Sequence, residues 1–142
     1  MEAKLKKWIA ATGKVDKHFK RAVKANEEEI IDANTAQLST GKDSLGEFLD
    51  DYLFDSYAKM KKAMGSNAPL GVPDLKLEGD FYEGFVIKYA GSEMWITSTD
   101  DKTSHLKEKY GDDIFGIAQE QLPTLSPLIL ESFLISFNNE LL

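Results

Sequence analysis

Residues 80–99 read DFYEGFVIKYAGSEMWITST, and this stretch decides the fold because its apolar residues leave the helical spacing of the rest of the chain. Phe81, Phe85, Ile87 and Tyr89 fall on one side of an extended chain and alternate with Tyr82, Val86 and Lys88, which is typical of a half-buried strand. Gly91-Ser92 fits the glycine-first two-residue turn, and strand-forming residues follow it. The sequence therefore predicts an antiparallel hairpin over about residues 80–99, with a register fixed by its short loop.

The chain before the hairpin begins with a basic amphipathic pattern. Residues 4–24 hold eight lysines and arginines against one acid, Asp16, and an acidic run at residues 27–29 follows. Apolar residues recur at three-and-four spacing, which predicts one long helix over about residues 3–38, or two helices broken near Thr12-Gly13. The basic half is either a surface for nucleic acid or an acidic partner, or a solvated helix face, and we favour the solvated face.

Residues 48–64 allow two interpretations. Phe48, Tyr52, Tyr57 and Met60 suit the spacing of a helix, but the aromatic density also allows an extended start followed by a helix over residues 55–64. In both cases the Tyr and Met stripe is expected in the core. Gly, Pro, Asn and Ser are concentrated in residues 65–73, which predicts a linker without helix.

Two helices are expected after the hairpin. Asp100 or Ser98 can cap a short helix over residues 102–110, and Gly111 is expected to end it in the left-handed conformation. Ser126 and Pro127 suit the N-cap and first position of a final helix whose apolar face is wider than one stripe. Such a helix packs on two neighbours, either within the domain or across a subunit interface, and residues 138–142 leave an apolar tail for a partner.

Length and composition place these elements in one α+β domain. The chain of 142 residues is long enough to bury roughly two thirds of its unfolded surface in a single core. We divide it into a helical part at about 3–64, a linker at 65–73, and a part with the hairpin and C-terminal helices at 74–142. The net charge of −7 opposes non-specific binding to phosphate backbones, and the sequence contains no cysteine. No apolar run is long enough to span a bilayer, and the first residues lack a secretory apolar region, so we expect a protein made in the cytoplasm with no membrane partner.

The stretch KYGDDIFG at residues 109–116 contains YGDD, a tetrapeptide that presents metal-binding aspartates in RNA-dependent polymerases. Such an enzyme needs further carboxylates and a polymer groove, which take several times this length. Asp112 and Asp113 are expected to follow a helix rather than to sit in a turn between strands. We therefore expect no metal site, no catalytic residue and no cofactor, and a metal-dependent enzyme that uses these two aspartates is the least favoured alternative.

The order of these features resembles the small phage virion-morphogenesis or tail-completion proteins, which act at the head–tail neck. The resemblance covers about residues 26–118 and rests on short motifs. In that family a helix leads to a loop with two spaced glycines, and a lysine-containing segment precedes the sheet. A Leu-Thr-Gly-x-hydrophobic signature opens the first strand, and a Tyr or Phe followed by Gly comes near the end of the sheet region. The matching residues here are Gly41 and Gly46; Tyr57, Lys59 and Lys61; residues 77–81, which read LEGDF; and Tyr110-Gly111 or Phe115-Gly116.

The resemblance implies a structural protein that performs no chemistry and is located in the virion after synthesis in the host cytoplasm. It implies contacts with connector or tail subunits and with copies of itself in a ring, with DNA only passing nearby. The candidate partner contacts are Trp95, Phe115, Phe137, Leu141 and Leu142. Taken by itself, Trp95 on a strand beside Met94 and Ile96 is more often a half-buried packing residue than a platform for stacking a ligand. A small adaptor or a nucleic-acid-associated regulatory module is the alternative function.

Overall fold

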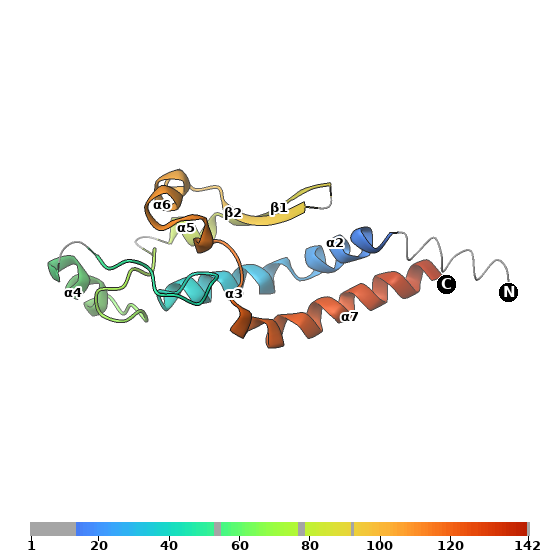
Figure 1. Cartoon of the computed structure of the whole chain (residues 1–142), viewed down its shortest axis with the longest axis horizontal. Coiled ribbons are helices and arrows are strands. Elements are labelled where there is room, and N and C mark those ends of the chain that lie inside the picture. The colour runs from blue at the N-terminus through green and yellow to red at the C-terminus, as the bar shows by residue number, and fades with distance from the viewer. Residues whose placement is uncertain (1–13, 53–54, 77–78, 92, 142) are drawn as a thin grey trace.

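The computed structural model describes residues 14–52, 55–76, 79–91 and 93–141. Figure 1 shows an elongated molecule in which α2 and α3 run along the middle, the hairpin lies on one side of them and α7 on the other. The helix α4 lies at one end, and α5 and α6 lie near the base of the hairpin. The expected α+β class is confirmed for this part of the chain.

The N-terminal helical region consists of α2 (Val15–Ala25) and α3 (Glu27–Ser39), separated at Asn26. The expectation of one long helix is therefore wrong for the described residues, and the alternative break near Thr12-Gly13 lies outside them. The Asn26 side-chain amide explains the break, because it donates to Ala22 O at 2.8 Å and to Ser132 Oγ of α7 at 2.9 Å. An asparagine that bonds to nearby backbone and to another helix competes with continuation of its own helix.

The segment after α3 follows the second of the two interpretations. Phe48 is extended and forms an isolated antiparallel bridge with Lys42, and α4 begins only at Asp55 (Asp55–Ala63). Residues 65–73 contain no helix, as their composition predicts.

The hairpin consists of β1 (Phe85–Ala90) and β2 (Glu93–Ser98), and it pairs Ala90 with Glu93 across a two-residue loop. Gly91 has a φ of 59°, as the glycine-first turn requires. The prediction is wrong for residues 80–83, which form the helical turn α5 (Asp80–Glu83). Gly84 then fixes the start of β1, because a Cβ there would lie 2.6 Å from Ser98 Oγ.

The short helix α6 (Thr103–Tyr110) lies where the sequence predicts it, and Gly111 follows it with φ 90° and ψ 170°. This conformation has a positive φ but is not the expected left-handed helical one. Asp100 and Ser98 do not cap α6 directly. Instead, Asp100 Oδ2 accepts from the Lys102 amide at 3.3 Å and orders the turn before the helix.

The loop after α6 is held by two buried side chains of α3. The Asn34 amide donates to Ile114 O at 3.0 Å and accepts from the Gly116 amide at 2.9 Å. One turn later, Gln37 donates to Gly116 O at 3.2 Å and accepts from the Ala118 amide at 2.8 Å. These bonds satisfy backbone groups that would otherwise be buried without partners, so α3 determines the path of residues 114–118.

The final helix α7 (Leu122–Leu141) begins earlier than predicted, after the 3₁₀ turn η2 (Gln119–Gln121). Pro127 lies inside it, so Ser126 is not its N-cap. The missing N–H of Pro127 affects only the first turns of the helix. Tertiary contacts hold these turns, because Leu125 is buried against α2 and α3 and Gln121 Nε2 donates to Ala33 O at 2.8 Å.

The core has two parts, and both of them include residues from the same face of the hairpin. The aromatic part is built on five buried residues, Leu38, Leu49, Phe81, Phe85 and Ile114. The rings of Phe81 and Phe85 meet edge to face at 5.0 Å, and Phe115 covers both of them. The second part joins α2, α3 and α7 through Val23, Ile30 and Leu125, with Ile87 and Met94 of the hairpin packed against it.

Candidate functional site

One surface feature is a side of α7 on which the described residues cover a row of apolar side chains only in part. Five apolar residues recur at helical spacing beside the buried side of the helix, and we call them the apolar flank: Leu130, Phe133, Leu134, Phe137 and Leu141. Leu130 is 57% and Leu134 is 46% exposed, although both are large aliphatic residues. The rings of Phe133 and Phe137 stack at 6.0 Å between centroids. Exposed apolar residues scattered singly are normal, but a row along one helix is typical of an interaction surface.

The opposite side of α7 borders a groove shared with α2. Leu128 and Ile135 lie one above the other on this side and are 36% and 56% exposed. The groove has a volume of about 650 Å³, and its lining includes Ile135, the basic residues Lys17 and Arg21 of α2, and polar side chains of α7. Thus α7 presents exposed aliphatic residues on both sides of its contact with α2.

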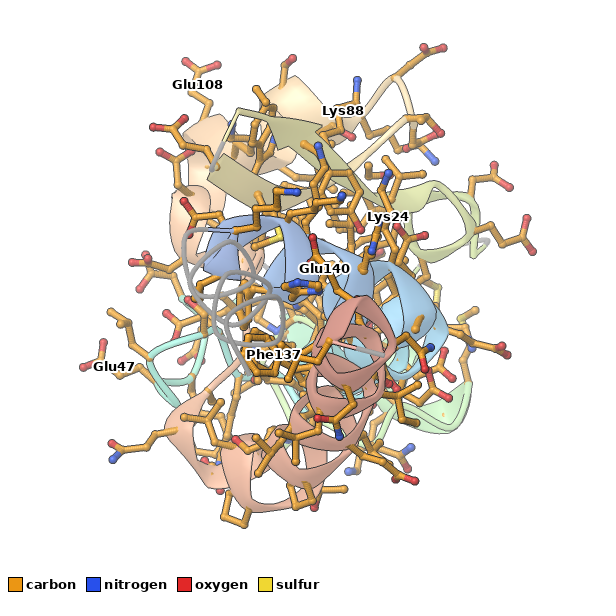
Figure 2. All side chains as sticks on the ribbon, turned by 90° about the vertical axis from the view of Figure 1, so that its right-hand side faces the viewer. Lys24, Glu47, Lys88, Glu108, Phe137 and Glu140 are labelled. Carbon is orange, nitrogen blue, oxygen red and sulfur yellow. The ribbon has the colours of Figure 1, made fainter. Side chains whose placement is uncertain are left out.

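A polar clamp fixes α7 on α2. His18 of α2 is fully buried, and its Nδ1 lies 2.8 Å from Ser136 Oγ while its Nε2 contacts the Glu140 carboxylate. Glu140 also accepts from Lys14 Nζ at 3.1 Å. The bonded Lys14 ammonium lowers the pKa of Glu140 below its usual value, and His18 acts in the same direction. Figure 2, which looks along the helices, shows Glu140 between α7 and α2 and Phe137 on a different side of α7.

Ser136, His18 and Glu140 are the residue types of a hydrolase triad, so their geometry matters. Ser136 and Glu140 lie one turn apart on the same helix and hold the imidazole between them. The imidazole is fully buried, with Phe133 and Phe137 against its edges. The backbone N–H groups around Ser136 are used within α7 and cannot form an oxyanion hole. The cluster therefore has the geometry of a structural clamp.

Sequence reasoning missed this clamp because its members on α2 are 118 or more residues from those on α7. One signal was present, since His18 lies on the side of α2 that also carries the buried Ala22. A histidine on the buried side of a helix needs polar partners from the facing element.

The predicted partner contacts fall in different environments. Phe137 and Leu141 belong to the apolar flank, and Leu142 lies outside the described residues. Trp95 is 44% exposed on the outer face of the hairpin, opposite Lys88. Phe115 is half-buried against Phe81 and Phe85, so its ring supports the aromatic core and is not part of an open surface.

Asp112 and Asp113 lie in the 3₁₀ turn η1 (Asp112–Ile114). The Asp112 side chain is 86% exposed and lies 3.4 Å from Lys107 Nζ, whereas the backbone carbonyl of Asp113 accepts from the Ser44 amide at 2.8 Å. Among the described residues, no three His, Asp or Glu side chains are grouped so that they could hold a metal ion. The described helices also include none with the length and apolarity needed to cross a membrane.

The basic face of α2 is partly used within the fold. Lys20 and Lys24 lie over the Tyr89 ring of the hairpin at 5.2 and 5.0 Å from its centroid, and the Tyr89 hydroxyl bonds to Glu27. Lys14 is held by Glu140. Lys17 and Arg21 remain exposed at the groove beside α7.

Comparisons with protein-family models, with curated proteins and with solved structures found no match. The resemblance to phage neck proteins therefore stays a prediction. One of its elements also differs from the structure, because Phe81 lies in α5 and the first strand begins only at Phe85.

Proposed function

We propose that this protein is a structural assembly protein that acts through contacts between its own copies and with neighbouring subunits. The apolar flank of α7 carries this proposal, because it leaves Leu130 and Leu134 about half exposed to water. Complete burial of a leucine side chain contributes about 1.5–3 kcal/mol, so even half of this area, repeated along a helix and on two partners, supports association.

The partner proposed for the flank is a second copy of the chain. The described surface carries unlike charges at separate places: Lys17 and Arg21 are exposed on α2, and Glu28, Glu29 and Asp32 are exposed at the start of α3. Two copies placed head to tail can bring a basic region beside an acidic one while α7 is covered. A contact between different surfaces of identical subunits closes into a ring when its rotation permits.

The place of this assembly is proposed from the resemblance. Gly41 and Gly46, the lysine segment of α4 and the aromatic-glycine pairs suit a head–tail neck or tail-completion component of a phage virion. The partners would then be connector or tail subunits, with DNA passing through the ring. The net charge of −7 is compatible with this role, because an acidic lumen does not retain DNA.

The test is analytical ultracentrifugation of the wild type and of Leu130→Ser/Leu134→Ser. We expect the wild type to form oligomers and the variant to dissociate at the same concentration. Leu45→Ser/Leu70→Ser is the matched control, since these leucines are 66% and 60% exposed outside α7. A monomeric wild type, or equal dissociation of both variants, would contradict assembly through α7.

Two further measurements separate the parts of the proposal. Assembly guided by the unlike charges weakens as salt rises, because exposed charges are screened beyond about 10 Å at 0.1 M salt. If sedimentation does not change with salt, the charges do not guide assembly, and only the apolar contact of α7 remains in the proposal. Electron microscopy of the oligomer tests the ring, and a gel shift with a steep salt dependence would favour a nucleic-acid-associated module instead.

A further inference from the structure

A pocket at the other end of the molecule has the features of a ligand site. It lies between α4, α5 and α6, has a volume of about 350 Å³, and is mainly apolar. Four aromatic rings form much of its wall, those of Tyr52, Tyr57, Phe81 and Tyr110. Tyr52 and Tyr57 meet edge to face at 4.8 Å. A concave, mostly aromatic pocket with a few polar groups is the usual form of a small-molecule site, and this volume suits one or two rings.

The polar group of the pocket is a buried lysine. Lys61 is 5% exposed, and its Nζ lies 2.8 Å from Asp74 Oδ1 and donates to the backbone carbonyl of Lys76. An ammonium has three N–H donors, and within the described part of the chain only these two acceptors contact it. Because Lys61 lines the pocket, its third N–H is available to an acceptor on a ligand.

The backbone beside this lysine is strained. Leu75 has a φ of 56°, and it is the only non-glycine residue with positive φ in the described ranges. Asp74 holds this conformation from both sides, since its carboxylate accepts from the Lys76 amide at 3.0 Å and its carbonyl accepts from the Tyr82 hydroxyl. The strained turn directs the Lys76 carbonyl toward Lys61. Strain of this kind costs about 1–3 kcal/mol and is typical of ligand-binding positions.

The charges around the pocket favour an anion. Asp74 neutralises Lys61. Among the other described residues of the lining, three exposed lysines, Lys76, Lys102 and Lys109, stand against one exposed carboxylate, Asp80. The lining therefore carries an excess of positive charge in a chain whose net charge is −7. Burial, together with the charge of Asp74, raises the pKa of Tyr52, so its hydroxyl stays neutral and adds no negative charge.

We propose that this pocket binds a small anion that carries a planar aromatic ring. The ring lies against Tyr52, Tyr57 and Tyr110, and the carboxylate or phosphate accepts from Lys61 and faces the exposed lysines. Replacing a buried ion pair by apolar residues is often neutral or stabilising, so the Lys61–Asp74 pair is poorly explained by stability alone. This proposal does not depend on self-association through α7.

The experiment is a titration of the full ¹⁵N-labelled chain, followed by amide NMR, with two pairs of probes. Indole-3-acetate and indole-3-acetamide share the indole ring, but only the first carries a carboxylate. AMP and adenosine share the adenine ring, but only AMP carries a phosphate. We expect at least one anion to shift the amides of Tyr57, Leu106 and Tyr110, and its neutral counterpart to bind more weakly. The preferred anion distinguishes a carboxylate from a phosphate ligand.

Two variants test the site itself. Lys102→Gln/Lys109→Gln should weaken binding of the preferred anion about fivefold, since exposed charges contribute modestly. Lys17→Gln/Lys88→Gln removes the same charge from exposed residues outside the pocket and should leave binding unchanged. Leu106→Trp should fill the pocket and abolish binding. Absence of binding by both anions at millimolar concentration, equal binding of the neutral probes, or equal weakening by both lysine pairs would overturn the proposal.

Discussion

The two ends of the molecule bury their apolar residues in different ways. At the end of α4, α5 and α6, aromatic side chains from four segments enclose one another, and Phe81 and Phe85 are almost fully buried. At the end of α2 and α7, two helices share one contact, and large aliphatic side chains of α7 stay exposed. The first end stabilises the single chain. The second leaves Leu130 and Leu134 of α7 about half exposed among the described residues, and this difference is the basis for proposing assembly through α7.

The largest expected effect comes from the aromatic end. Phe85→Ala removes a ring that contacts Phe81, Tyr82 and Phe115, so we expect a loss of about 3–5 kcal/mol in the free energy of unfolding. Leu130→Ala, made at the exposed flank, should change the unfolding of the monomer by less than about 0.5 kcal/mol. Urea denaturation at low protein concentration measures both. Similar losses in the two variants would mean that the flank is covered within the monomer.

A smaller loss in the free energy of unfolding is expected at Asn34 of α3, which holds the loop of residues 114–118 between the two ends. Asn34→Leu removes the partners of Ile114 O and the Gly116 amide and leaves both backbone groups buried, which should cost about 2–4 kcal/mol. The control is Asn67→Leu at an exposed position, which should be nearly neutral. Hydrogen exchange should show faster exchange of residues 114–118 in the Asn34 variant. Unchanged exchange there would mean that Asn34 does not hold this loop.

The smallest effect concerns the clamp between α2 and α7 and depends on pH. The pKa of Glu140 is lowered in the folded chain, so its contribution to stability is present above its unfolded pKa of about 4.3 and is lost as pH falls through the lower folded value. We expect Glu140→Gln to be less stable than the wild type at neutral pH and the two to converge in acid. Denaturation of both proteins across this range tests it, and a difference that grows in acid would contradict the clamp.

The sequence predicts those turns and helix ends that are determined by a few neighbouring residues. The turn at Gly91 and the helix end at Gly111 were predictable because a few adjacent residues fix them. The helical turn at residues 80–83 was not predictable, because the apolar spacing around Phe81 is compatible with a strand and with a helical turn. The choice depends on the close approach of Gly84 to Ser98, which the fold brings about. Helix α7 begins before Pro127 because distant contacts of Leu125 and Gln121 hold the turns that precede the local start signal at Ser126-Pro127.

The candidate surfaces were predictable only where they depend on spacing. The apolar pattern of residues 128–141 indicates Phe137 and Leu141 as contacts, and in the structure both are partly buried members of the apolar flank of α7. Neither the clamp at His18 nor the buried Lys61 could be recognised, because their partners are brought close only by the fold. Lys61 illustrates the difficulty, since a lysine in the helix of residues 55–63 is ordinarily solvated.

The pairing of α2 with α7 also has a consequence for synthesis of the protein. More than a hundred residues separate His18 from Ser136, so the ribosome must complete most of the chain before α2 meets the helix that covers it. Contacts between such distant segments slow folding and leave apolar surface open to aggregation meanwhile. The hairpin and α6 use near neighbours in the chain and can form earlier. We therefore expect the nascent chain to fold from its middle outward, with α2 dependent on chaperones until α7 emerges.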